Sequence, residues 1–165
     1  MSDMIASLKQ EPFSDKLQRK IDELVLRYPR PLSALVPILR AIQEEKGCVS
    51  PPSQLRVAER MAISPAWVAG VVSFYTMLNE KKIGKYHLQI CRTLPCALRG
   101  CGALREHISR KLQIPVGGTS ADGKFTLSSV ECLGSCDTAP VVQINDQYFE
   151  DLTLAKIDHV LARLV

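Results

Sequence analysis

Cysteines are the residues of this sequence whose type and spacing could do chemistry. Four residues separate Cys91 from Cys96, and four separate Cys96 from Cys101. A second group, Cys132 and Cys136, follows with three residues between its members. Thiols grouped in this way indicate metal binding, redox chemistry or disulfides, and the cellular compartment separates these possibilities.

The N-terminal segment argues for a reducing compartment. MSDMIASLKQEPFSD carries four charged residues and lacks the apolar run of a signal peptide. The longest strongly apolar stretch, around Trp67–Val72, is far shorter than the ~20 residues that a membrane helix needs. We therefore expect a cytoplasmic protein with no direct membrane insertion. Cytosolic thiols usually stay reduced, which favours metal binding or redox chemistry over structural disulfides.

Apolar residues at helical spacing predict that residues 1–82 form an N-terminal helical domain. Ser50-Pro51 and Ser64-Pro65 resemble helix starts, with a serine cap before a first-turn proline. The helix predicted over residues 65–78 is apolar nearly all round, as in helices buried within a chain or against another chain.

The spacing of apolar residues changes at NEKKIGK, and residues 83–165 are predicted to form an α/β domain. Its expected order is strand, helix, strand, strand, strand, helix. The predicted strands span residues 85–91, 124–131 and 140–144, with a short one near Tyr148, and the helices span about 97–113 and follow Thr153. A helical crossover makes the first two strands parallel, which is compatible with a thioredoxin-like fold.

Helical phase separates the cysteines of the first group. The inward stripe of the helix predicted over residues 97–113 contains Ala97, Cys101, Leu104, Ile108 and Leu112. Cys101 is therefore expected in the core, whereas Cys91 and Cys96 are expected to face outward at a strand end and a helix start. Cys48, near another helix end, is interpreted as an ordinary core or turn cysteine.

Two parallel neighbouring strands would bring the cysteine groups together. Cys132 and Cys136 flank a loop after the second strand, and Gly134 leaves that loop free to bend. Loops that follow neighbouring parallel strands emerge at the same edge of a sheet. Four thiolates, from Cys91, Cys96 and this second pair, could then converge.

Four thiolates favour a [2Fe–2S] cluster or a zinc ion. The gaps of four and three residues suit the larger cluster better than the tight knuckles of structural zinc, although they leave zinc open. A thioredoxin-like dithiol would need C-x-x-C near the first helix, and that motif is absent.

Other functional classes have less support. The three histidines, His87, His107 and His159, lie on different predicted elements and form no triad or metal set. With aromatic residues at only 5%, the basic residues near the cysteines lack the interleaved aromatics of a nucleic-acid surface. No G-x-G-x-x-G or P-loop motif is present, so nothing in the chain predicts nucleotide binding.

Three elements of the sequence resemble one family. The C-x4-C pair Cys91 and Cys96, ADGKFTL at 121–127 and ECLGSCDTAPVVQIN at 131–145 resemble the thioredoxin-like [2Fe–2S] ferredoxins, and ISPAWVAGVVSFYTML at 63–78 is similar to the family's N-terminal stretch. The family includes the NuoE-type peripheral-arm subunit of respiratory complex I. Related subunits occur in NAD-linked hydrogenases and formate dehydrogenases.

The resemblance implies a function and a ligand set. It implies a subunit of an NADH-dependent oxidoreductase, most commonly NADH:quinone oxidoreductase, with Cys91, Cys96, Cys132 and Cys136 as the [2Fe–2S] ligands. A tight partner is implied too: a flavoprotein subunit that binds FMN, NADH and its own iron–sulfur cluster. On this interpretation the chain is an electron carrier without hydride-transfer or acid–base residues, and its larger complex lies peripheral to the inner face of a membrane. A hydrogenase or formate dehydrogenase host and a zinc-stabilised binding module remain the alternatives.

Overall fold

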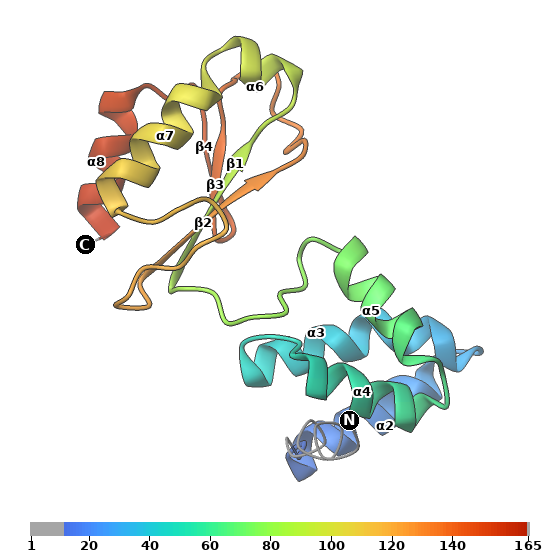
Figure 1. Cartoon of the computed structure of the whole chain (residues 1–165). Helices are drawn as coiled ribbons and strands as arrows, with labels where there is room; N and C mark the ends of the chain where they lie inside the picture. Colours follow the sequence, from blue (N-terminus) through green and yellow to red (C-terminus); the bar gives the residue numbers. More distant parts are fainter. Residues whose placement is uncertain (1–11, 165) are drawn as a thin grey trace. The chain divides into compact units, whose positions relative to one another are not determined.

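A computed structural model describes residues 12–164 of the chain. The chain divides into two compact units, of which the first ends at Lys82 and the second begins at Ile83. Each unit has its own hydrophobic core, and the two described sets of core residues have no member in common. Figure 1 draws the first unit in blue to green and the second in green to red.

The first unit is a bundle of helices. They are α2 (Asp15–Arg27), the 3-10 helix η1 (Pro31–Ala34), α3 (Leu35–Lys46), α4 (Pro51–Met61) and α5 (Pro65–Phe74). Ser50 caps α4 as predicted, because its Oγ accepts the backbone N–H of Ser53 at 3.4 Å. Ser64 precedes Pro65 as predicted, but its side chain makes no capping hydrogen bond. Within residues 12–164, no helix is both long and apolar enough to cross a membrane.

Helix α5 leaves apolar side chains in solvent. It ends at Phe74 instead of continuing to residue 78, and of its residues Val68 and Val72 are buried. The most exposed large apolar side chains on and just after this helix are Trp67 (57% exposed), Phe74 (77%) and Met77 (56%). We call these three residues the α5 face. Burial within the chain, one of the two expectations for this helix, therefore applies to its inner stripe alone.

The second unit is built on a four-stranded sheet in the order β2-β1-β3-β4. The strands are β1 (Tyr86–Cys91), β2 (Phe125–Val130), β3 (Val142–Ile144) and β4 (Gln147–Phe149). β1 and β2 run parallel, as predicted, whereas β3 pairs antiparallel with both β1 and β4. β1 is thus an inner strand of the sheet, and its C-terminal end carries Cys91.

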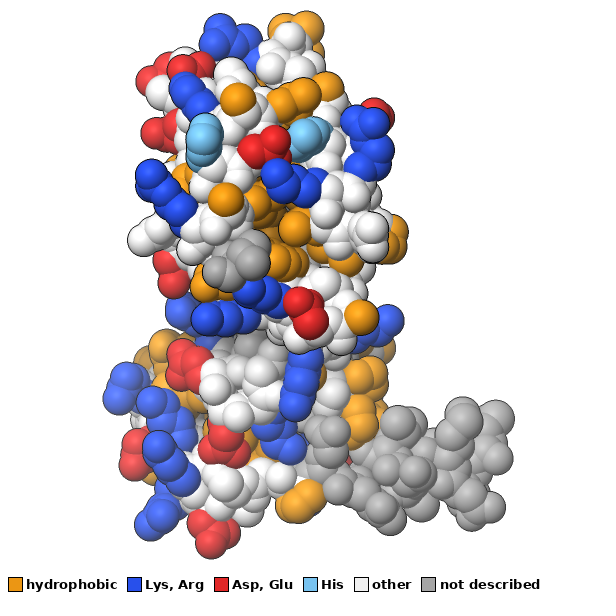
Figure 2. All heavy atoms as spheres, turned by 90° about the vertical axis from the view of Figure 1, so that its left-hand side faces the viewer, with side chains coloured by type: hydrophobic (Ala, Val, Ile, Leu, Met, Phe, Trp, Pro, Cys, Tyr) orange, Lys and Arg blue, Asp and Glu red, His pale blue; other side chains and the backbone are white. Residues whose placement is uncertain are grey.

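Helices α7 (Cys101–Leu112) and α8 (Leu154–Leu164) lie side by side against this sheet (Figure 1). Asp158 of α8 joins them, since its Oδ1 accepts from Lys111 Nζ at 2.7 Å and lies 2.8 Å from His107 Nε2. Thr153 caps α8 as predicted, because its Oγ1 accepts the Lys156 N–H at 3.2 Å. Figure 2 shows that basic and acidic side chains are mixed over the face it draws, without separation of the two signs.

Residues 97–113 form parts of two helices and not the single helix predicted. A short helix, α6 (Leu94–Leu98), precedes α7, and the chain breaks between them at Gly100, whose φ is +89°. Glycine adopts this left-handed conformation without the steric cost of a Cβ. The apolar spacing is continuous in sequence, so the pattern of side chains alone does not reveal the break. Ala97, predicted to face inward, is exposed, and Cys96 is the buried residue of α6.

Candidate metal centre

Cys91 and Cys96 form the first cysteine pair. Cys91 is the last residue of β1, and Cys96 lies in α6. They are 2% and 1% exposed, so the prediction that they face outward is wrong. For Cys96 the reason is the break at Gly100: in one continuous helix, five positions at about 100° each would turn Cys96 about 140° away from the inward Cys101. Two separate helices allow both thiols to enter the core.

The first pair is electrostatically asymmetric. Burial raises the pKa of Cys96 to about 11, and the neighbouring Cys91 adds to this. Burial also raises the pKa of Cys91, but hydrogen bonds from the Thr93 hydroxyl and from backbone N–H groups, including that of Leu133, outweigh it and bring the pKa below its ordinary value. Thr93 Oγ1 lies 3.3 Å from Cys91 Sγ. Cys91 is therefore the first of the pair to become a thiolate, and Cys96 donates its proton toward it.

Cys132 and Cys136 form the second pair, in the loop between β2 and β3. Both are exposed, and Gly134 bends the loop at φ +79°. The Gly134 N–H donates to Cys132 Sγ at 3.3 Å. A hydrogen bond with Cys132 and the charge of that thiolate raise the pKa of Cys136, which places the two thiols close together.

The parallel pairing of β1 and β2 brings the two pairs to the same end of the sheet. Cys91 lies opposite Val130, two residues before Cys132. The backbone N–H of Leu133, inside the second loop, bonds to the Cys91 thiol, and the charge of Cys91 contributes to the raised pKa of Cys136. The two cysteine-bearing segments therefore meet at the same end of the sheet, as the strand order predicts.

The thiols come together as two pairs, not as one compact set. Among residues 12–164, no group of three or more His, Cys, Asp or Glu side chains is arranged to hold a single metal ion.

The remaining cysteines lie in the two cores. Cys101, the first residue of α7, is 5% exposed as predicted, and burial raises its pKa. It belongs to the same core cluster as Cys91 and Cys96. Cys48 is also buried, at 9% exposure, and belongs to the first unit.

Ion pairs connect the segments that carry the cysteines. Arg92, next to Cys91, donates through Nε to Glu131 Oε1 at 2.9 Å, and Glu131 immediately precedes Cys132. Arg92 and Glu131 have side chains 58% and 66% exposed, so the pair contributes little to stability and mainly aligns the two segments. Since Arg92 is already paired with an acid, it is not an isolated positive charge beside the thiols.

Several residues that surround the thiols carry no clear signal in the sequence. Thr93 had one detectable signal, a hydroxyl two residues after a strand-end cysteine. Ser135 and Thr138 lie in the second loop, and Tyr148 and Glu150 contact that loop from beyond β3. Their roles depend on the pairing of β4 with β3, which no local pattern around the cysteines encodes.

Known proteins are similar to this chain in sequence and in fold. The pattern of the thioredoxin-like [2Fe-2S] ferredoxin family matches residues 21–165. A subunit of the NADH-quinone oxidoreductase of Rickettsia conorii is 41% identical over 155 residues, which cover 92% of this chain and 93% of that protein. The NADH-quinone oxidoreductase subunit 2 of Thermus thermophilus is 40% identical over 155 residues, with 92% of this chain and 86% of that protein covered.

Among solved structures, an NAD+-reducing [NiFe]-hydrogenase in the air-oxidized state contains a similar fold. The TM-score is 0.64 at 21% sequence identity, and the match covers 76% of this chain and 22% of the longer hydrogenase chain. This likeness concerns the fold alone. The match of the family pattern, together with relatives at about 40% identity along nearly the whole chain, confirms the predicted fold class and the resemblance: the chain belongs to the thioredoxin-like [2Fe-2S] ferredoxin family.

Proposed function

We propose that this protein is the electron-transfer subunit of an NADH-oxidising complex and that Cys91, Cys96, Cys132 and Cys136 hold its [2Fe–2S] cluster. The observation that carries the proposal is the convergence of two cysteine pairs from neighbouring parallel strands. Membership of a [2Fe-2S] ferredoxin family supports the nature of the cofactor.

Membership of a [2Fe-2S] ferredoxin family favours the cluster over zinc. A [2Fe–2S] cluster takes four cysteine thiolates, two on each iron. Structural zinc takes four ligands around a single ion. A zinc-stabilised binding module is therefore the second candidate, and the metal content of the protein distinguishes the two.

When bound, a [2Fe–2S] cluster supplies a site that takes up and releases a single electron. The protein's own contribution is to hold the sulfur ligands and to donate hydrogen bonds to them. Thr93 and the Leu133 N–H donate to Cys91, and the Gly134 N–H donates to Cys132. Donors of this kind stabilise additional negative charge on the ligands, which raises the reduction potential.

The expected electron donor is the FMN of a partner flavoprotein subunit that also binds NADH and its own iron–sulfur cluster. Relatives at about 40% identity are named as subunits of NADH-quinone oxidoreductases, which supports a larger complex of that type. We expect that complex to lie peripheral to the inner face of a membrane. The α5 face supports a permanent partner, because large apolar side chains that remain in solvent commonly mark a protein–protein interface.

Anaerobic purification of the full chain tests the cofactor. We expect iron and acid-labile sulfide in equal amounts and an EPR signal that appears on reduction. Zinc in place of both iron and sulfide would overturn the proposal. Identification of the chains that co-purify with this one tests the host complex: a flavoprotein with quinone-reductase subunits is expected, whereas hydrogenase or formate dehydrogenase subunits would contradict that assignment.

A further inference from the structure

One short segment contacts both parts of the chain that carry the cysteines. It comprises residues Tyr148–Asp151, at the end of β4 and in the turn that follows, and we call it the strap. We propose that the strap positions the two cysteine pairs relative to one another, with Glu150 as the main positioning residue for the Cys132–Cys136 loop. The inference rests on the proposed function because the pairs are taken as ligands of one cluster.

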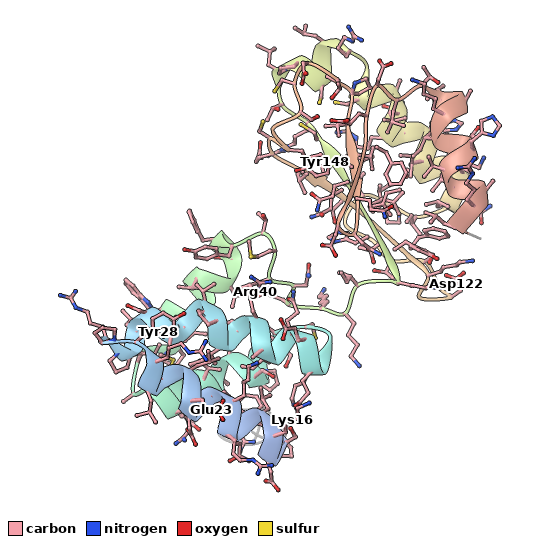
Figure 3. All side chains as sticks on the ribbon, turned by 180° about the vertical axis from the view of Figure 1, so that it is seen from behind. Lys16, Glu23, Tyr28, Arg40, Asp122 and Tyr148 are labelled. Atoms are coloured by element: carbon pink, nitrogen blue, oxygen red, sulfur yellow. The ribbon has the colours of Figure 1, made fainter. Side chains whose placement is uncertain are left out.

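Tyr148 makes the first contact of the strap. Its Oη donates to the carbonyl oxygen of Leu133, within the second cysteine loop, at 2.9 Å. Figure 3 labels Tyr148, whose side chain is 48% exposed. The same residue Leu133 donates its N–H to Cys91. Tyr148 therefore fixes the peptide segment that links the two pairs.

Glu150 makes the second contact. Its Oε1 accepts from Thr138 Oγ1 at 2.8 Å and also from Ser135 Oγ, and the two hydroxyl oxygens lie 2.8 Å apart. These hydrogen bonds hold the pKa of Glu150 below its ordinary value, so the carboxylate is charged at neutral pH. Ser135 immediately precedes Cys136. One carboxylate thus anchors the loop on both sides of that cysteine.

Asp151 makes the third contact, to the other cysteine segment. Its carboxylate lies 3.6 Å from Arg99, which directly follows α6 and its Cys96. The Asp151 N–H donates to the Thr138 carbonyl oxygen at 2.6 Å, and its own carbonyl oxygen accepts from Lys156 Nζ at 2.8 Å. The strap therefore contacts α8 and also both segments that carry the cysteines.

These contacts matter because the second pair lies outside the core. Cys132 and Cys136 are exposed, and the loop between them contains a glycine with a left-handed backbone. The first pair, in contrast, is held within the core. A loop of this kind samples many conformations unless hydrogen bonds fix it, so the strap limits how far the second pair departs from a cluster-binding geometry.

Three single substitutions in the reconstituted full chain test the strap. Glu150→Ala removes the acceptor, Glu150→Gln removes the charge but keeps an oxygen acceptor, and Asp137→Asn removes a negative charge beside Cys136 as a matched control. We expect Glu150→Ala to speed iron loss to a chelator by about ten- to a hundredfold, the range typical of residues that orient metal ligands. Glu150→Gln should recover most of this loss, and Asp137→Asn should remain within about twofold of wild type.

Two further measurements separate positioning from misfolding and from charge. Hydrogen exchange of residues 132–138 should be faster in Glu150→Ala, while exchange within α7 stays at the wild-type level. The reduction potential should rise in Glu150→Gln and in Asp137→Asn, because each of these variants removes a negative charge that opposes reduction. Tyr148→Phe, which loses only the hydrogen bond to Leu133, should speed iron loss in the same direction as Glu150→Ala.

Equal rates of iron loss in Glu150→Ala and Asp137→Asn would overturn the proposal, as would unchanged exchange of residues 132–138. A failure of the proposed function is recognised separately. In that case wild-type protein would bind no iron and sulfide, whereas exchange in the metal-free full chain would still report whether Glu150 orders the loop.

Discussion

In the first cysteine pair, the Cys96 thiol holds a proton that must leave before Cys96 can act as a ligand. Burial raises the pKa of Cys96 to about 11, and its thiol donates to Cys91, whose own pKa is lowered. Thiolates and not thiols bind metals, so occupation of this pair is coupled to loss of the Cys96 proton. Cys101 lies in the same core cluster, but no hydrogen bond to a neighbouring thiol is among the causes of its raised pKa.

Serine substitutions separate ligands from core cysteines. Cys101→Ser should keep the cluster and lower the free energy of unfolding by about 1–3 kcal/mol, because it buries a hydroxyl in an apolar site. Cys132→Ser should lose the cluster or weaken it severely, since it removes a proposed ligand. Iron content and EPR of the reduced protein measure both effects. Loss of the cluster in Cys101→Ser with retention in Cys91→Ser would show that the assignment is wrong.

His87 makes the stability of the second unit depend on pH. It is 8% exposed, burial lowers its pKa, and its Nε2 lies 2.9 Å from Ser128 Oγ. The unfolded chain therefore binds the proton more readily than the folded one. Stability is fully present above the unfolded pKa of about 6.5 and falls as the pH drops from there toward the folded pKa.

We expect the free energy of unfolding of the wild type to decrease as the pH falls below about 6.5, by no more than about 1.4 kcal/mol per pH unit from this group. His87→Gln keeps a partner for Ser128 and should flatten the dependence in this window. Urea unfolding followed by circular dichroism measures it. An identical slope in the variant would assign the effect to other groups.

At the scale of elements, the strands and the order of the second unit could be predicted, but the path of the chain around the first pair could not. Alternating apolar residues identify β1, and the intervening helix predicts its parallel pairing with β2. The stripe from Ala97 to Leu112 is continuous in sequence, so it gives no sign that Gly100 turns left-handed. The burial of Cys96 follows from that single backbone conformation.

The contacts around the site illustrate a second limit of prediction. Cys132 and Cys136 could be connected with the first pair because strand order alone brings the loops together. Glu150 could not be connected with the cysteines in this way. Its role arises from hydrogen bonds made across a hairpin whose strands, β3 and β4, have three residues each. Short strands contain too few residues for a period of two to determine their facing.

Two glycines give a matched test of the helix break. Gly100 has φ +89° and Gly102 lies within α7, and a Cβ added at either would meet no atom within 4 Å. Gly100→Ala should therefore destabilise the second unit by about 1 kcal/mol through backbone strain alone. Gly102→Ala should stabilise it by about 0.5–1 kcal/mol through helix propensity. The midpoints of urea unfolding measure the stability of both variants. Equal shifts of the midpoint in Gly100→Ala and Gly102→Ala would contradict a special role for the backbone at Gly100.

At the scale of the whole molecule, the chain contains two cores. Both cysteine pairs belong to the second unit. The predicted domain boundary near residue 82 can be tested by expression of residues 83–165 alone. We expect this fragment to fold and to bind a [2Fe–2S] cluster with the EPR signal of the full chain. An unfolded fragment would show that the two units depend on one another for stability.

The α5 face has a consequence for the amount of this chain that a cell can make without its partner subunit. Trp67, Phe74 and Met77 remain open to water for as long as the chain is alone. Exposed apolar side chains of this size favour self-association of surplus copies. We therefore expect balanced synthesis to matter: production matched to the partner subunit should keep the chain in the supernatant, whereas overproduction of this chain alone should lead to precipitation.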